Sequence, residues 1–268
     1  MRIKKLRIVL VALFAVLAFS MPKPASAISV DLELLLLADV SGSLDATDFN
    51  LQRDGYVAAF RNAGIISQIE SGAIGSIAVS LVYWSTGQAT AVGWTLISDA
   101  VSANAFADAI AAAVRPSSGQ TGMTAALTYG TGLFNNNFEG TRQVIDISGD
   151  GAESVACNFN SAICAPLQLA RDAAIASGVD TINALWIDDR DFFGDDVADI
   201  IQAIPYGQNN VIAGPGAFSA IAQDFNSFAP AVLSKIEREI RPVPEPSTLL
   251  LLGSGLVGLG FVRRRFRG

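Results

Sequence analysis

Histidine is absent from all 268 residues of this chain. Its absence excludes Ser-His-Asp and Cys-His catalysis, histidine general bases and histidine metal ligands. Enzymes of these common kinds are therefore ruled out before any motif is considered. Any chemistry that the chain performs has to come from other side chains.

Cysteine is nearly absent as well. The two cysteines, Cys157 and Cys164, lie seven positions apart in one expected loop. That spacing excludes a C-x-x-C redox or zinc arrangement. We expect the two to pair in an oxidising compartment, because disulfides persist there. The bridge would pin the loop and contribute about 2–3 kcal/mol for so short a closure.

Basic residues are scarce between the two ends of the chain. Residues 28–243 carry 9 lysines and arginines against 24 aspartates and glutamates, a net charge of −15. A protein that binds nucleic acid needs a basic face for the phosphates, so we expect no nucleic-acid partner. The length of this segment suits one domain with a sizeable core. Its charge is typical of an exported protein that tolerates cations.

The N-terminal residues 1–27 have the layout of a secretory signal peptide. Four basic residues within the first seven positions precede the apolar run Ile8–Phe19 and the triplet Ala25-Ser26-Ala27. We predict cleavage after Ala27. Twelve apolar residues are too few to cross a bilayer, which takes about 20 residues. A permanent N-terminal anchor is therefore disfavoured.

The C-terminal residues 242–268 have a second three-part layout. Pro244, Glu245 and Pro246 precede an uncharged run over 247–262 and an arginine cluster that begins at Arg263. This tail resembles the PEP-CTERM sorting signal of Gram-negative bacteria. The resemblance implies processing by an exosortase, a transient transmembrane segment at about 247–262 and a final place at the cell surface or in the extracellular matrix. A plain tail-anchored protein is the alternative.

Strand-like and helix-like segments alternate from Asp31 to Ile240. This alternation predicts an α/β fold with a doubly wound, mostly parallel central sheet and helices on both faces. Ser76–Thr86 and Ala89–Ile97 are joined by a tight connection and are expected to be antiparallel, which makes one antiparallel edge strand. A short strand is expected at Val211–Ala213, and a closing helix at Asp224–Ile240. We assign the domain to residues 28–241.

Oxygen-bearing side chains follow the buried strand Leu34–Ala38. Asp39, Ser41 and Ser43 stand at alternate positions at its carboxyl end, where open α/β sheets bind ligands. Thr121 and Asp150 belong to two further loops that are expected at the same edge. Oxygen ligands suit a hard divalent cation. We expect Mg²⁺, with Mn²⁺ or Ca²⁺ as alternatives.

These motifs, in this order, resemble the von Willebrand factor type A (VWA) domain and its metal-ion-dependent adhesion site (MIDAS). Within that family the chain looks like a bacterial subfamily with no assigned function. The resemblance implies that Ser41 and Ser43 bind the metal directly, that Asp39 binds directly or through water, that Thr121 is a switchable ligand and that Asp150 binds through water. Thr124 is a rival to Thr121, but it is expected to lie inside the next helix. A simple helix-capping turn is the alternative interpretation of Asp39–Ser43.

Three other features receive structural interpretations. Asp146, inside an expected central strand, either braces the metal site or bonds to a neighbouring backbone. Six acids between Asp188 and Asp199 lack the spacing of an EF-hand loop and are expected to be solvated. Trp84 and Trp94 are expected to fill the core or its rim.

We expect a non-enzymatic binding module whose partner, a protein or an extracellular polysaccharide, supplies a carboxylate to the metal. A metal-dependent hydrolase is the second hypothesis. However, a hydrolase of the aspartyl-phosphate kind needs an acid two residues after Asp39, where Ser41 stands, and no glycine-rich phosphate loop follows the strand. The third hypothesis is a passive surface or matrix protein in which the metal only steadies the loops.

Overall fold

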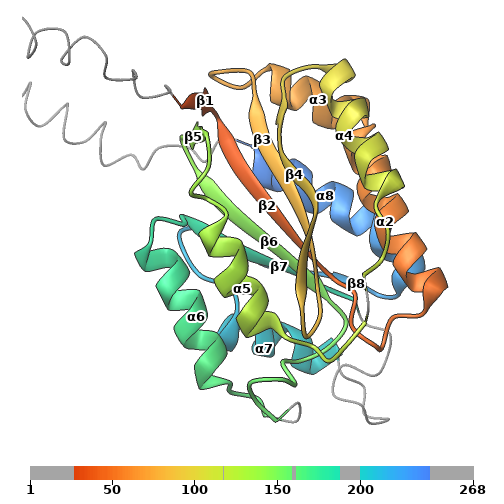
Figure 1. The fold of residues 1–268 in the computed structure, drawn as a ribbon, viewed down its shortest axis with the longest axis vertical. Coiled ribbons are helices and arrows are strands. Elements are labelled where there is room, and N and C mark those ends of the chain that lie inside the picture. Colours follow the sequence, from red (N-terminus) through yellow and green to blue (C-terminus); the bar gives the residue numbers. More distant parts are fainter. Residues whose placement is uncertain (1–26, 117, 159–160, 188–199, 242–268) are drawn as a thin grey trace, which may run out of the picture.

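A six-stranded sheet forms the centre of the protein (Figure 1). The computed structural model describes residues 27–116, 118–158, 161–187 and 200–241. The strand order is β4-β3-β2-β6-β7-β8, and every neighbouring pair is parallel except β3 and β4. The strands are β2 (Leu32–Asp39), β3 (Ile77–Trp84), β4 (Gln88–Ile97), β6 (Gln143–Gly149), β7 (Thr181–Ile187) and β8 (Ser219–Ala222). The predicted mostly parallel sheet with one antiparallel edge strand is confirmed.

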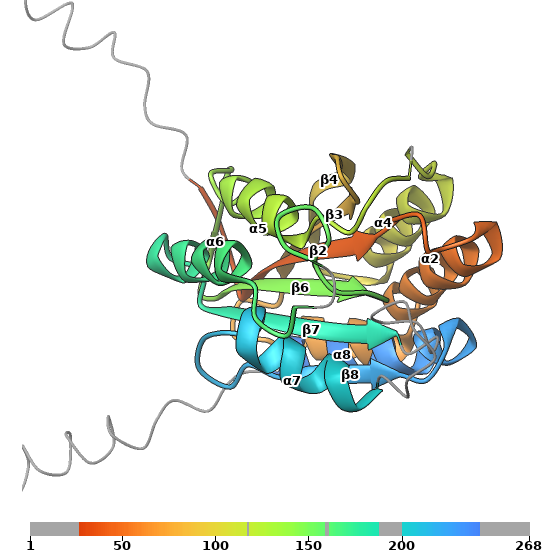
Figure 2. The same cartoon turned by 90° about the horizontal axis from the view of Figure 1, so that it is seen from below.

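Helices cover both faces of the sheet, as predicted (Figure 2). One face carries α2 (Ala46–Phe60), α3 (Ala63–Glu70), α4 (Ala100–Ala112) and α8 (Phe228–Ile240). The other face carries α5 (Met123–Gly132), α6 (Ala165–Ala176) and α7 (Ile200–Asn210). None of the helices in the described ranges is both long and apolar enough to cross a membrane. The predicted signal peptide and the segment at 247–262 lie outside those ranges, apart from Ala27.

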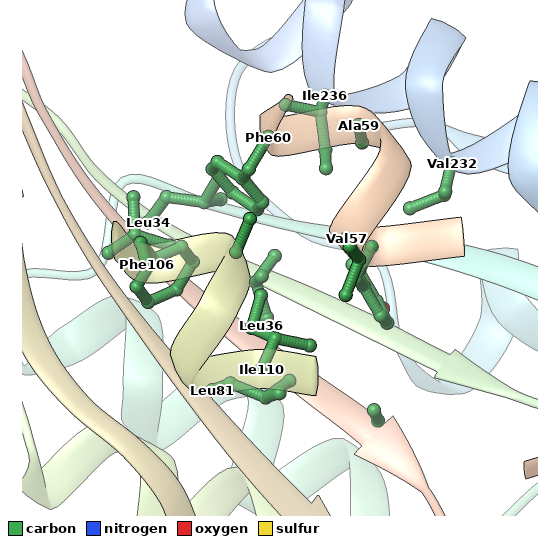
Figure 3. Close-up of a cluster of buried hydrophobic side chains, with 14 of the residues drawn as sticks. Leu34, Leu36, Val57, Ala59, Phe60, Leu81, Phe106, Ile110, Val232 and Ile236 are labelled. Carbon is green, nitrogen blue, oxygen red and sulfur yellow. The ribbon is translucent and has the colours of Figure 1, made fainter. Parts of the chain in front are cut away.

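Strand β2 is the centre of the core because all of its residues are buried. Side chains alternate between the faces of a strand, so Leu34 and Leu36 pack under α2 and α4 while Leu35 and Leu37 pack under α5. In Figure 3, Leu34 lies beside Phe106, and Leu36 lies beside Ile110. The rings of Phe60 and Phe106 meet edge to face with centroids 4.8 Å apart. The run of four leucines is therefore a strand buried on both faces, as its sequence predicts.

The edge strand beyond β7 differs from the prediction. Residues Val211–Ala213 form one antiparallel bridge, between Ala213 and Ile182, and no strand. Gly214 and Gly216 then adopt positive φ angles of 91° and 74°, which turn the chain back toward the sheet. The strand that pairs with β7 is β8, six residues later. The sequence predicts the edge strand before the turn at Gly214 and Gly216, whereas the strand that pairs with β7 follows that turn.

Two short strands had no signal in the sequence. β1 (Ile28–Val30) and β5 (Phe138–Gly140) pair in parallel beside the main sheet. Three residues are too few to produce a recognisable alternation of apolar and polar positions. The closing helix also begins later than predicted, because residues Phe225–Ser227 form a 3₁₀ turn capped by Asp224.

Cys157 and Cys164 form a disulfide with a Cα–Cα distance of 5.8 Å. The predicted pairing is confirmed. Cys164 is buried and directly precedes α6, so the bridge ties the loop after β6 to the start of that helix. The backbone N–H of Cys164 also donates to the side chain of Asn210 at 2.8 Å. The loop is thus held at both α6 and α7.

A glycine lets α2 and α8 approach closely. A Cβ atom at Gly55 would lie 2.7 Å from Cδ1 of Phe228 and 3.3 Å from Cα of Ala229. We predict that Gly55→Ala lowers the free energy of unfolding by about 1–3 kcal/mol, although alanine gains about 1 kcal/mol in helix propensity. Gly132→Ala at the end of α5 is the control, since no atom lies within 4 Å of its added Cβ. Denaturant unfolding measures both, and equal stability of Gly55→Ala and wild type would contradict the close contact.

Candidate metal site

The first loop of the site begins where β2 ends. Asp39 is fully buried, and its Oδ1 accepts a hydrogen bond from the backbone N–H of Ser41 at 2.7 Å. The hydroxyl oxygens of Ser41 and Ser43 lie 3.1 Å apart. Ser41 is buried whereas Ser43 is exposed. One carboxylate and two hydroxyls thus lie within five residues of chain, and only the hydroxyl of Ser43 belongs to an exposed residue.

These side chains are not used to cap α2. The cap is Asp45, whose Oδ1 accepts from the backbone N–H groups of Thr47 and Asp48 at 2.6 and 2.9 Å. Asp48 completes the capping box by accepting from the N–H of Asp45 at 3.0 Å. The interpretation of the Asp39–Ser43 motif as a simple capping turn therefore loses its physical basis.

A second loop, before α5, is hydrogen-bonded to the first. The N–H of Gly42 donates to the carbonyl of Gly119 at 2.7 Å. The N–H of Gln120 donates to Oγ1 of Thr86 at 2.8 Å. A Cβ atom at Gly119 would lie 2.5 Å from that same hydroxyl, so the loop passes too close to Thr86 for any other residue. The predicted ligand Thr121 follows directly and is half-buried.

The third loop follows β6 and contacts the second. Asp150 comes one residue after the strand and is 2% exposed. Ser154 and Thr121 exchange two hydrogen bonds: the N–H of Ser154 donates to the carbonyl of Thr121 at 2.8 Å, and the N–H of Thr121 donates to Oγ of Ser154 at 3.0 Å. The structure therefore brings together, at the carboxyl ends of neighbouring strands β2 and β6, the three loops that carry the predicted ligands.

Thr121 and Thr124 differ in their place relative to α5. Thr124 is the second residue of this helix, as expected, and its N–H donates to Oε2 of Glu153 at 2.6 Å. Its hydroxyl oxygen is buried and makes no hydrogen bond to the described residues. Thr121 lies in the loop before the helix, and it is hydrogen-bonded to Ser154 in the loop that begins at Asp150. The position of Thr121 fits the predicted ligand, and its role remains a prediction.

The electrostatics of the site favour a bound cation. Burial and, next, the charge of Asp150 raise the pKa of Asp39 well above its usual value, although hydrogen bonds from Ser41 oppose this shift. Oδ2 of Asp39 accepts no hydrogen bond from the described residues. Two buried carboxylates that repel each other are unfavourable unless a positive charge lies between them. The oxygen donors present fit a divalent cation of the Mg²⁺ or Ca²⁺ type.

Gly149 leaves room for the carboxylate of Asp39. A Cβ atom at position 149 would lie 3.0 Å from Oδ2 of Asp39 and 3.3 Å from Cζ2 of Trp84. Trp84 is fully buried, as predicted. Trp94 is half-buried at the rim, and its indole N–H donates to the carbonyl of Leu133 at 2.8 Å. Trp84 therefore forms one wall of the space that Asp39 occupies.

Arg115 holds the first loop, and the sequence analysis did not identify it. Its guanidinium donates to the carbonyls of Ser41 and Leu44 at 2.9 and 2.8 Å, and to that of Val40 at 3.2 Å. The same group lies 5.7 Å from the ring centroid of Phe49 on α2. No spacing in the sequence links Arg115, about 75 residues downstream, to this loop. It positions the loop through hydrogen bonds to backbone carbonyls.

Two more positioning residues were missed. Nε2 of the buried Gln52 donates to the carbonyl of Asp39 at 2.8 Å. The buried carboxylate of Glu153 accepts from the N–H groups of Val155 and Ala156 at 2.8 and 2.9 Å, besides that of Thr124. Glu153 thereby places a carboxylate at the N-terminal end of α5, where it interacts favourably with the positive end of the helix dipole. The N-cap of α5 makes no side-chain hydrogen bond of its own.

Asp146 does not belong to this site. It forms a buried ion pair with Lys235 of α8, on the opposite face of the sheet from α5. Neither of the two interpretations from the sequence identified this partner. The acids between Asp188 and Asp199 lie outside the described residues. Across the described ranges, no three side chains of His, Cys, Asp or Glu gather where they could hold a metal. The candidate site accordingly has only two carboxylates, and hydroxyls supply its other oxygens.

The sequence matches a known family over residues 29–244, which is most of the chain. The chain belongs to the DUF1194 family. The description of that family is "Protein of unknown function". Residues 242–265 of this DUF1194 protein match the PEP-CTERM protein-sorting motif, which includes Pro244, Glu245 and Pro246. The resemblance of the tail to this signal is confirmed, and the motif implies an exported protein that an exosortase processes. No curated protein sequence matches the chain.

Solved structures show the same fold at low sequence identity. The pilus adhesin SpaC of Lactobacillus rhamnosus GG matches with a TM-score of 0.54 and 17% identity, over 79% of this chain and 30% of its own. The proximal thread matrix protein 1 of the mussel byssus, with a zinc-occupied MIDAS motif, matches with a TM-score of 0.51 and 16% identity, over 79% and 48%. This chain thus spans less than half the length of either protein. A von Willebrand factor type A protein of Catenulispora acidiphila is a further match, with a TM-score of 0.49, 14% identity and coverage of 79% and 43%. The DUF1194 chain therefore has the same fold as SpaC and the mussel protein, which agrees with the VWA-like α/β domain that its motifs indicated.

The repulsion between Asp39 and Asp150 is expected to lower the stability of the metal-free protein. Asp150→Asn removes one of the two charges, so we expect it to raise the free energy of unfolding in EDTA by about 1 kcal/mol. The same variant should lose the stabilisation that Mg²⁺ gives to the wild type. Thermal and denaturant unfolding measure both effects. Asp172→Asn, an exposed acid on α6, is the control and should change neither. A destabilised Asp150→Asn in EDTA would contradict the repulsion.

Proposed function

We propose that this DUF1194 protein is an exported, non-enzymatic binding module that holds a protein or extracellular polysaccharide through a divalent cation. The observation that carries the proposal is the convergence of Asp39, Ser41, Ser43, Thr121 and Asp150 at one edge of the sheet. Three hydrogen-bonded loops bring these residues together, at the place where parallel α/β sheets bind ligands.

The oxygen donors would leave a position on the ion for a partner. Ser41, Ser43 and Thr121 are neutral, and only Asp39 and Asp150 carry charge. An Mg²⁺ ion normally has six oxygen ligands, so neutral hydroxyls and two acids leave residual positive charge and room for another oxygen. A carboxylate from an acidic protein side chain or a uronate supplies both. Mg²⁺ is the expected ion, with Mn²⁺ or Ca²⁺ as alternatives, and the zinc in the mussel protein adds Zn²⁺ to the ions worth testing.

A binding role fits the site better than a purely structural one. The loops are already joined by the Gly42–Gly119 and Thr121–Ser154 hydrogen bonds, and Arg115 donates to four carbonyls of the first loop. A metal is therefore not needed to hold the loops in place. The solved structures with this fold include an adhesin and a matrix protein, and both roles are compatible with binding without catalysis.

The two ends of the chain would place the site outside the cell. We assign residues 1–27 to a signal peptide, cleaved after Ala27, and residues 247–262 to a transient span of the inner membrane. The PEP-CTERM motif over 242–265 supports processing by an exosortase at that membrane. The processed protein would then reach the cell surface or the extracellular matrix, where a metal-dependent contact can hold it to a partner.

Metal binding is testable by thermal unfolding of the full chain in a mild detergent. We expect Mg²⁺ to raise the free energy of unfolding, by about 2.7 kcal/mol at one hundred times the dissociation constant, and EDTA to reverse the gain. Asp39→Asn should abolish the response, whereas Asp172→Asn should keep it. Parallel titrations with Mn²⁺, Ca²⁺ and Zn²⁺ rank the ions. An equal response of Asp39→Asn and wild type would rule out this metal site.

Partner binding is testable by capture from the extracellular matrix of the producing cells. The immobilised chain should retain its partner in Mg²⁺ and release it in EDTA, while Asp39→Asn retains none. A capture that ignores EDTA would overturn the metal-dependent contact. Turnover of a chromogenic phosphate ester that disappears in Asp39→Asn would instead favour the hydrolase hypothesis. If Mg²⁺ raises stability but changes no interaction, the passive matrix role is favoured.

A further inference from the structure

A second pocket lies at the opposite edge of the sheet from the metal site. It has a volume of about 400 Å³ and opens between the amino ends of β6 and β7, the turn before β8 and the end of α8. Val144 and Thr181 stand near the beginnings of their strands, whereas Asp39 and Asp150 stand at the carboxyl ends. The pocket therefore shares no residue with the candidate metal site.

Two arginines that line the pocket, Arg238 and Arg241, make no ion pair with the described acids. The guanidinium of Arg238 lies 3.7 Å from the ring centroid of Phe218, a residue that lines the pocket. Arg241 is exposed at the C-terminal end of α8. Guanidinium groups are the side chains that bind carboxylates most specifically.

A third arginine is already committed to the fold. The guanidinium of Arg142 donates to the carbonyls of Glu239 and Arg241, at 2.7 and 3.2 Å, and so holds the end of α8 against the start of β6. Burial lowers the pKa of Arg142, and the charges of Asp180, Glu239 and Asp31 oppose this shift. Arg142 thus fixes the position of the pocket wall, while Arg238 and Arg241 remain available to a ligand.

The floor of the pocket is a buried carboxyl group. Oε1 of Glu239 accepts from Lys235 at 2.7 Å and from Asn183 at 2.9 Å. Oε2 of Glu239 is buried and has no hydrogen-bond partner among the described residues. Burial and the charge of Asp146 raise the pKa of Glu239 to about 7, against the effect of Lys235. A hydroxyl group on a ligand satisfies this oxygen in either protonation state, because a hydroxyl both donates and accepts.

We propose that this pocket binds a small hydroxylated carboxylate, of the size and type of a hexuronate. Arg238 and Arg241 would bind its carboxylate, Oε2 of Glu239 would bind a hydroxyl, and Val144, Pro215 and Phe218 would contact the apolar face of its ring. The pocket volume holds one monosaccharide unit. This site is independent of the metal site, and binding at it does not depend on the proposed adhesion function.

Calorimetric titration of the full chain in mild detergent tests the proposal, with EDTA present so that the metal site does not contribute. We expect D-glucuronate to bind at a single site. D-glucose lacks the carboxylate and inorganic phosphate lacks the ring and its hydroxyls, so both should bind at least about tenfold more weakly. Binding of phosphate as tight as that of glucuronate would overturn the ligand class, and absence of glucuronate binding would overturn the site.

Substitutions localise the binding. Arg238→Gln and Arg241→Gln should each weaken glucuronate about tenfold or more, because each removes a charged hydrogen-bond donor. Arg61→Gln, an exposed arginine at the end of α2 that lines no part of the pocket, is the control. Glu239→Gln should reduce the preference for glucuronate over acetate, and its thermal unfolding confirms that it is folded. Unchanged binding in both arginine variants would place the ligand elsewhere and overturn the assignment.

Discussion

Burial of β2 on both faces is the constraint on which the rest of the structure depends. The strand lies between two parallel neighbours, β3 and β6, and helices pack on both of its sides. A shift of one residue in register would turn Leu34 and Leu36 toward α5 and Leu35 toward α2, so the register is strongly specified. The position of Asp39 follows from it, because the carboxylate stands at the last residue of a strand that cannot slide.

Buried charged groups gather in two places, under α8 and at the carboxyl edge of the sheet. Under α8, Lys235 pairs with both Asp146 and Glu239, so its positive charge offsets part of the two negative charges. At the carboxyl edge, burial and the charge of Asp150 raise the pKa of the buried Asp39. Arg115 donates its hydrogen bonds to backbone carbonyls of the loop that follows Asp39. Two buried acids therefore interact where the proposed cation would bind.

How much of this site the sequence predicts depends on how local each signal is. Asp39, Ser41 and Ser43 follow a strand that is evident from its leucines, and Asp150 follows a second strand of the same kind, so their common edge could be predicted. Arg115, Gln52 and Glu153 could not, because each acts through a hydrogen bond to a backbone group whose position exists only in the folded chain. The disulfide was predictable because two cysteines allow one pairing.

The fold, too, could be predicted only where the signal in the sequence is local. Long elements with a clear pattern, such as β3 and β4, were predicted to within a few residues. β8 was misplaced because the turn at Gly214 and Gly216 depends on positive φ angles that composition only hints at. β1 and β5 are too short to carry a pattern. Asp146 is polar inside an apolar strand, and its partner Lys235 is nearly 90 residues away, so only the packing of α8 on the sheet reveals the pair.

A row of buried polar contacts joins the helical layer to the sheet between the two sites. Nε2 of Gln52 donates to the carbonyl of Asp39, the hydroxyls of Tyr56 and Ser148 lie 3.0 Å apart, and Lys235 pairs with Asp146 two residues before Ser148. Gln52 and Tyr56 belong to α2, Lys235 to α8. Hydrogen bonds and ion pairs are directional, whereas apolar packing tolerates small shifts. The leucines of β2 thus form the apolar centre of the core. The polar row fixes where α2 and α8 lie over β6. The positions of these two helices in turn determine the shape of both the metal site and the second pocket.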